Sequence, residues 1–169
     1  GIASTDGGRL LAANLRAAID PASFPADTHG FAVATQKHES AHLLVLDPYA
    51  WDLPMLVAYG LVDSVAILND LQRRDEDIQK HIGRSSNEPR FSVPHGLARY
   101  GEQIYFQLLN CGLRIAPSAA SGSGECDNPP GYNRVYVACG QDFSTDSWWA
   151  NLERGRAIIS NGPLLRVRV

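Results

Sequence analysis

The segment Trp148-Trp-Ala-Asn-Leu-Glu-Arg-Gly-Arg-Ala-Ile-Ile-Ser-Asn-Gly-Pro-Leu-Leu165 indicates the fold class, because it joins a helix to a strand through a clear stop. Residues 144–146 supply Ser, Thr and Asp, which are side chains that cap helices, and Gly155 suits the left-handed residue that ends one. The sequence then predicts a strand over 156–160, an Asn-Gly-Pro turn and a last strand over 164–169.

The rest of the chain repeats this alternation. The expected elements are a helix carrying Leu11, Leu15, Ala18 and Ile19, a helix over 30–37, buried strands over 42–46 and 62–68, a helix capped by Asp52 and stopped by Gly60, a helix over 97–111 stopped by Gly112, and strands over 113–116 and 132–138. Strands that alternate with helices predict an α/β fold with a mainly parallel sheet.

Residues 69–96 are the longest polar stretch of the chain. Unstructured loops of this length are uncommon in compact domains and often serve as lids or binding loops. A merely solvated or partly helical excursion is the equal alternative.

Length and composition set the broad class. A chain of 169 residues with a net charge of −3 suits a single domain, and no basic run suggests nucleic acid. No apolar stretch has the length of a membrane span, so we expect no membrane segment. The sequence leaves the compartment open, and removal of a signal peptide would place the chain outside the cytoplasm. The sequence is also compatible with a homo-oligomer.

The three cysteines are Cys111, Cys126 and Cys139. Their odd number and the lack of a C-x-x-C spacing argue against a zinc knuckle or a disulfide framework. Free cysteines packed as small apolar residues are favoured over a single bridge between Cys126 and Cys139, which flank a Pro-Pro-Gly turn.

Five segments, in order along the chain, resemble one family of hydrolases. They are His42–Pro54 with its Asp-Pro-Tyr-Ala-Trp-Asp-Leu-Pro ending, Val62–Asn69, Ile104–Ser118, Gly131–Val137 and Trp148–Leu165. Together they resemble the carbaryl-hydrolase-like CehA/McbA branch of the PHP (polymerase and histidinol phosphatase) superfamily, and they cover most of residues 41–169.

The resemblance implies a distorted PHP-type (β/α) barrel, of which residues 1–169 would form one domain or the C-terminal portion. In that family, metals lie at the carboxyl ends of the strands, where barrel enzymes place their chemistry. The implied activity is metal-dependent hydrolysis of a small phosphoester, carbamate or ester, with Zn, Mn or Fe as the divalent metal.

Several metal-ligand positions of the family are altered in this chain. The early H-x-H pair is absent, Asp47 precedes proline where a histidine often stands, Gly122 falls at a ligand aspartate, and Leu71 replaces a histidine. The remaining metal candidates are Asp47 and His42. We therefore expect a degenerate metal site and weak or absent activity, with a non-catalytic domain that binds a ligand or partner as the alternative.

A second motif competes with this interpretation. His38-Glu39-Ser40-Ala41-His42 matches H-E-x-x-H, which on a helix lets both histidines hold zinc while the glutamate activates water. The run Leu-Leu-Val-Leu after His42 favours a strand instead, and a strand would separate the two histidines. A zinc peptidase is the third hypothesis.

The catalytic residues are not identifiable from the sequence, but a candidate pocket is. It consists of Asp47, Trp51, Asp52, Asn69, Arg156 and Asn161. Several of these residues could equally have ordinary structural roles. Asp52 suits a helix N-cap and Asn161 suits a tight turn.

Overall fold

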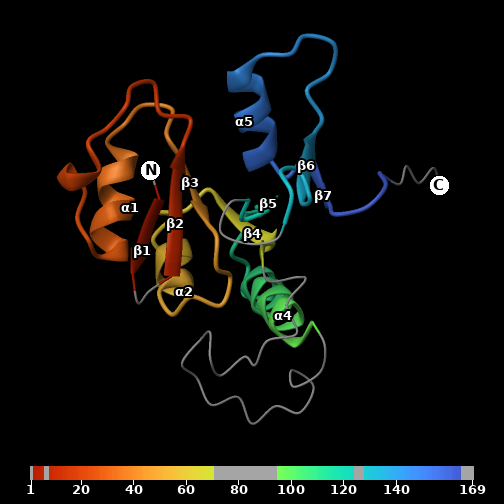
Figure 1. Cartoon of the computed structure of the whole chain (residues 1–169), viewed down its shortest axis with the longest axis horizontal. Helices are drawn as coiled ribbons and strands as arrows, with labels where there is room; N and C mark the ends of the chain where they lie inside the picture. Colours follow the sequence, from red (N-terminus) through yellow and green to blue (C-terminus); the bar gives the residue numbers. More distant parts are fainter. Residues whose placement is uncertain (1, 6–7, 71–94, 124–127, 165–169) are drawn as a thin grey trace.

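The computed structural model describes residues 2–5, 8–70, 95–123 and 128–164. It is an α/β structure with a five-stranded sheet in the order β1-β2-β3-β4-β5 and a separate pair, β6-β7 (Figure 1). The strands are β1 (Ile2–Thr5), β2 (Gly8–Ala13), β3 (His42–Val45), β4 (Ser64–Leu68), β5 (Ala116–Ala119), β6 (Arg134–Val137) and β7 (Ala157–Ser160). The helices are η1 (Pro21–Ser23), α1 (Thr28–Gln36), α2 (Leu53–Ala58), α4 (Gly96–Asn110) and α5 (Thr145–Glu153).

The three strands at one side of the large sheet are parallel, as expected. β3 pairs with β4 and β4 with β5 in parallel, whereas β1, β2 and β3 pair antiparallel. Helices α2 and α4 lie between successive parallel strands of the chain, as crossover connections require. The described strands form an open sheet with β1 and β5 at its edges, so they do not themselves form a closed barrel.

The helix expected around Leu11 and Leu15 is wrong, because this part of the chain is a β-hairpin. Leu10 and Ala12 are buried and their neighbours are less so, which is the period of a strand. β2 pairs along its length with β1 on one side and β3 on the other. The short apolar run of 10–13 fits either type of element, and pairing with distant strands decides between them.

Most of the other expected elements are confirmed within a few residues. α5 begins with a capping box at Ser144, and Gly155 follows it with a φ of +70°. α4 and α2 are likewise followed by glycines with positive φ, at Gly112 and Gly60. β5 starts at Ala116, later than expected, and the expected last strand lies outside the described residues except for Leu164, which is not in a strand. The polar stretch lies outside them over 71–94.

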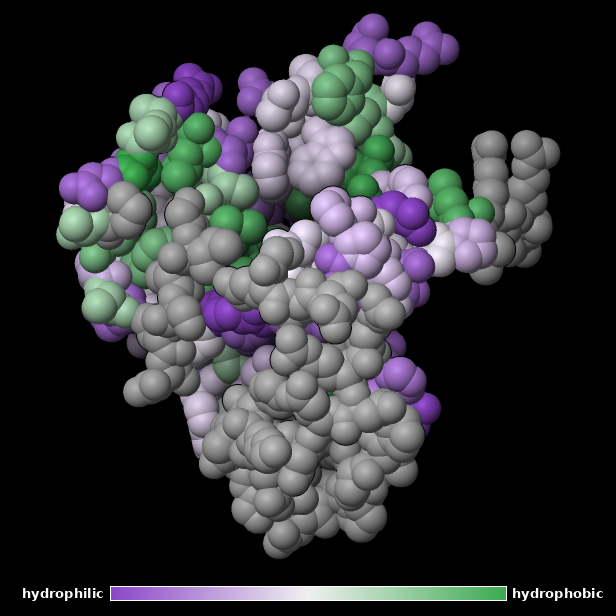
Figure 2. Space-filling model, viewed as in Figure 1, coloured by the Kyte–Doolittle hydropathy of each residue, from purple (hydrophilic) through white to green (hydrophobic). Residues whose placement is uncertain are grey.

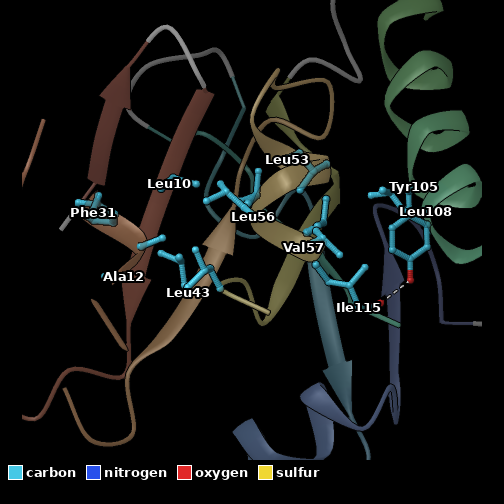
Figure 3. Close-up of a cluster of buried hydrophobic side chains, with 14 residues drawn as sticks. Leu10, Ala12, Phe31, Leu43, Leu53, Leu56, Val57, Tyr105, Leu108 and Ile115 are labelled. Carbon is cyan, nitrogen blue, oxygen red and sulfur yellow. Dashed lines mark hydrogen bonds between the residues drawn. The ribbon is translucent and has the colours of Figure 1, made fainter. Parts of the chain in front are cut away.

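One face of the sheet carries the main core. Side chains of β2, β3 and β4 pack there against α1, α2 and α4, and Figure 3 shows Val57 of α2 and Leu108 of α4 within this cluster. The buried members are Leu10, Ala12, Phe31, Ala32, Leu43, Val45, Leu53, Leu56, Val57, Leu61, Val65, Tyr105, Leu108 and Ile115. The phenol of Tyr105 donates to the carbonyl of Ile115 at 3.0 Å and fixes α4 to the segment that enters β5.

On the coloured part of the surface in Figure 2, hydrophilic and hydrophobic residues are mixed in small patches. Among the described residues, no helix is long and apolar enough to cross a membrane. Cys111 is exposed and Cys139 partly exposed, and both are free thiols, whereas Cys126 lies outside the described residues.

Candidate functional site

The carboxyl ends of the parallel strands carry the main cluster of buried charge. Asp47 follows β3, and Asn69 and Asp70 follow β4. β2 runs antiparallel to β3, so its second residue, Arg9, lies at this same edge, where its carbonyl accepts a hydrogen bond from Leu46 at 2.9 Å. Ligands of open α/β sheets commonly bind in this region.

Arg9 joins the two aspartates. Its Nε and Nη2 donate to the carboxylate of Asp47 at 3.0 and 2.6 Å, and its Nη2 and Nη1 donate to the carboxylate of Asp70 at 2.8 and 3.3 Å. The backbone N–H of Arg9 also donates to Asp47, at 2.9 Å. We call Arg9, Asp47 and Asp70 the edge triad.

The edge triad is well shielded from water. The side chains of Asp47 and Asp70 are 7% and 8% exposed, and that of Arg9 is 22% exposed. The hydrogen bond with Asp47 raises the pKa of Arg9, an effect that burial partly opposes. Burial also raises the pKa of Tyr49, whose hydroxyl contacts Asp47 at 3.3 Å. The guanidinium therefore stays charged and offsets part of the charge of two buried carboxylates.

Close backbone packing holds the loop that follows β3. A Cβ on Gly101 of α4 would lie 2.6 Å from Cγ of Pro48, so only glycine lets the helix approach there. A Cβ on Gly8 would lie 2.4 Å from Cβ of Ala50. The contact between Gly101 and Pro48 positions Asp47, which precedes Pro48. The contact between Gly8 and Ala50 positions Arg9, which follows Gly8.

Amide side chains extend the polar edge toward β5 and β6. Nδ2 of Asn133 donates to the carbonyls of Asn69 at 2.8 Å and Ala120 at 2.9 Å, and Nδ2 of Asn128 donates to those of Asp70 at 3.2 Å and Ser121 at 3.0 Å. Asn133 is buried, and its Oδ1 has no hydrogen-bond partner among the described residues. These amides join the ends of β4 and β5.

Gly122 packs against the edge triad. It has a φ of +62°, and a Cβ built on it would lie 2.4 Å from Cβ of Asp70. Any side chain here would collide with the aspartate that binds Arg9. The family resemblance implies a ligand aspartate at position 122. An aspartate does not fit there as long as Asp70 occupies its present position.

The described residues at this edge do not fit a divalent cation. Both carboxylates already bind a guanidinium, and Gly122 has no donor atom. Within the described ranges there is no group of three or more His, Cys, Asp or Glu side chains arranged to hold a metal ion.

No family model, curated protein or solved structure gives a significant match to this chain. The fold and the geometry of the site are therefore the basis for the proposals that follow.

The structure brings together only some of the predicted pocket residues. Asp47 and Asn69 lie at the carboxyl edge, where Nδ2 of Asn69 donates to the carbonyl of Leu46 at 3.4 Å. Trp51 is 63% exposed. Asp52 stands at the N-cap of α2, but its side chain makes no capping bond and accepts a hydrogen bond from Thr28 instead.

Arg156 and Asn161 lie at opposite ends of β7. Arg156 pairs with Ala138 after β6, and Ser160 lies opposite Arg134, next to Asn133 at the carboxyl edge. Five residues of extended chain separate the two side chains by about 16 Å. Asn161 is thus at the same end of the structure as Asp47, and Arg156 is not.

His42 is far from Asp47, although the sequence offered both as metal candidates. It begins β3 and Asp47 follows that strand, so the two lie about 16 Å apart. The zinc-peptidase hypothesis requires His38, Glu39 and His42 to lie on one helix, and they do not. α1 ends at Gln36, His38 lies in an exposed turn and Glu39 is exposed as well.

Sequence reasoning missed Arg9, Asp70 and Asn133. Asp70 had a usable signal, because it follows a buried strand directly, as Asp47 does. Arg9 had none, since it lies on the hairpin that the sequence presents as a helix.

Proposed function

We propose that this chain is a degenerate relative of the PHP/CehA-like metal-dependent hydrolases, weakly active or inactive as a hydrolase of phosphoesters, carbamates or esters. In this proposal the carboxyl edge still carries two buried carboxylates, those of Asp47 and Asp70, but a side-chain cation binds them in place of a metal. Arg9 is that cation.

The arrangement of Arg9 between Asp47 and Asp70 is the observation that carries the proposal. A guanidinium presents its N–H groups in a planar fork that suits two carboxylates at once. It offsets part of their charge permanently, because arginine does not lose its proton in proteins. A divalent ion at the same carboxylates would have to displace a buried, hydrogen-bonded ion pair.

The packing of Gly122 on Asp70 supports the same proposal independently. The residue that could have supplied a further ligand has no side chain, and the space for one is filled by Asp70. Gly122 thus leaves room for the aspartate that binds Arg9 and supplies no ligand atom itself.

The test compares wild-type protein with Arg9→Ala. We expect wild type, purified without chelator, to contain no stoichiometric Zn, Mn or Fe and to hydrolyse ester and phosphodiester substrates at the background rate. Arg9→Ala frees two buried carboxylates, so we expect millimolar Mn²⁺ to raise its thermal unfolding temperature while leaving that of wild type unchanged. Asp52→Ala is the control, because its carboxylate binds Thr28 away from the edge triad.

Stoichiometric metal in wild type that disappears in Asp47→Ala, together with hydrolysis lost in the same variant, would contradict the proposal. An Arg9→Ala protein that folds but gains no stabilisation from Mn²⁺ would show that Arg9 does not substitute for a cation.

A further inference from the structure

A second polar cluster lies at the other end of the parallel strands, between the sheet and α5. The imidazole of His42 is 1% exposed, its Nε2 lies 2.7 Å from Oγ of Ser64, and its Nδ1 lies 3.2 Å from Oε1 of Glu153. The ring of Trp149 covers it at a centroid distance of 4.4 Å. Glu153 and Trp149 belong to α5, so His42 connects this helix to β3 and β4.

The partners of His42 define its tautomer. A carboxylate oxygen accepts hydrogen bonds, so in the neutral imidazole Nδ1 carries the hydrogen toward Glu153 and Nε2 accepts the hydroxyl hydrogen of Ser64. Ser64 is fully buried, so the Ser-His-Glu series does not present a nucleophile to a substrate.

The charged groups that face His42 are Glu153 on α5 and Asp63 before β4, whose carboxylate accepts a hydrogen bond from the backbone of Leu43 at 2.7 Å. Burial lowers the pKa of His42 from its ordinary value of 6.5, an effect that Asp63 partly opposes. Burial also raises the pKa of Asp63. The nearby pair of Arg16 and Glu39 is 67% and 87% exposed and is screened by water.

We propose that α5 is a clamp that acid releases. It is docked on the sheet while His42 is neutral, and it undocks when His42 is protonated, while the rest of the sheet stays folded. Protonation in the docked state would turn Nε2 into a donor and leave the Ser64 hydroxyl hydrogen without its acceptor. The carboxylate of Glu153 would offset only part of the new charge, because its side chain is 48% exposed and water screens it. An undocked helix lets the ring take its proton in water.

The contacts of α5 make this release local. Leu152 is the buried residue of the helix, and the helix packs against β5 and β6 as well as on His42. Leu43 and Val45, the neighbours of His42 on β3, belong to the core under α1 and α2 on the opposite face of the sheet. In Figure 1, α5 stands apart from those helices.

The direction of the pH effect follows from proton binding. Below a pH of about 6.5 the undocked state binds more protons than the docked state, so docking weakens by at most about tenfold per pH unit until the docked histidine titrates. Asp63 acts in the opposite direction at lower pH. Its raised pKa means that the docked state binds its proton first, which favours docking.

Hydrogen exchange of the full chain at pH 7.5 and 5.5, corrected for the intrinsic exchange rate, tests the proposal. We expect the protection of residues 145–153 to fall, by at most about tenfold, with α1 and β2 unchanged. Trp148 and Trp149 fluorescence in a Trp51→Phe background should report the same transition. His42→Gln should lose the response, the exposed His38→Gln should keep it, and Asp63→Asn, which retains an acceptor for Leu43, should enlarge it.

Equal protection of α5 at the two pH values in wild type would overturn the proposal, as would an equal loss in α1 or a response that persists in His42→Gln. Should His42→Gln fail to fold, the NMR titration of His42 in wild type decides. A pKa below the ordinary value, with a matching change at Trp149, is expected, and a pKa at or above it overturns the clamp.

Discussion

At the residue scale, the carboxyl edge depends on a few side chains whose positions require one another. Arg9 bridges Asp47 and Asp70, and Asp70 occupies the space that a side chain on Gly122 would need. Buried ion pairs are costly to break because the remaining partner is left charged and unpaired. At Gly122, the addition of a single methyl group should therefore already destabilise the protein.

Replacing Gly122 with alanine should destabilise the protein by about 2–4 kcal/mol. Roughly 1 kcal/mol comes from the left-handed backbone and the rest from overpacking against Asp70. Urea unfolding measures the change. Gly112→Ala is the matched control, because its φ is +82° and nothing lies within 4 Å of its Cβ. It should lose only about 1 kcal/mol, and an equal loss in both variants would show that the contact with Asp70 is unimportant.

At the element scale, α5 is defined by its own sequence but held by others. The hydroxyl of Ser144 accepts from the N–H of Ser147 at 3.0 Å, and the hydroxyl of Ser147 contacts the N–H of Ser144 at 3.1 Å, which completes a capping box. The cap stabilises the helix locally, whereas docking depends on His42 and Trp149. The two effects are separable by experiment.

Replacing Ser144 with alanine should cost about 1 kcal/mol, because the first turn of α5 loses its acceptor. The same change should increase hydrogen exchange in α5 equally at pH 7.5 and 5.5, since the cap does not titrate. Ser144→Asp retains an acceptor and should keep near wild-type stability. A pH-dependent effect of Ser144→Ala would mean that capping and docking are not separate.

At the scale of the whole molecule, the parallel strands separate two polar clusters. The edge triad lies beyond the carboxyl end of β3, and the His42 cluster lies at its amino end, about 16 Å away. The apolar residues of β3 and β4 fill the distance between them. Since no charged group is shared among the described residues of the two clusters, their contributions to stability should be independent.

A double-mutant cycle tests that independence. Asp70→Asn weakens the edge triad and Glu153→Gln weakens the α5 contact, and the two changes in the free energy of unfolding should add to within about 0.5 kcal/mol. Urea unfolding of the four proteins at pH 7.5 supplies the measurement. A larger interaction energy would reveal coupling along the strands.

The amino-acid sequence by itself determined the helices with clear caps and glycine stops, the buried strands β3 and β4, and Asp47 as a residue at a strand end. These follow from local signals that do not depend on distant contacts. Only the tertiary structure decided that residues 8–13 form a strand, because the run fits two periods and its pairing with β1 and β3 selects one. The same pairing brings Arg9 to Asp47 and Asp70, and it takes His42 to the opposite end of β3 from Asp47. Such contacts join residues 38 and 61 positions apart, so no local pattern contains them.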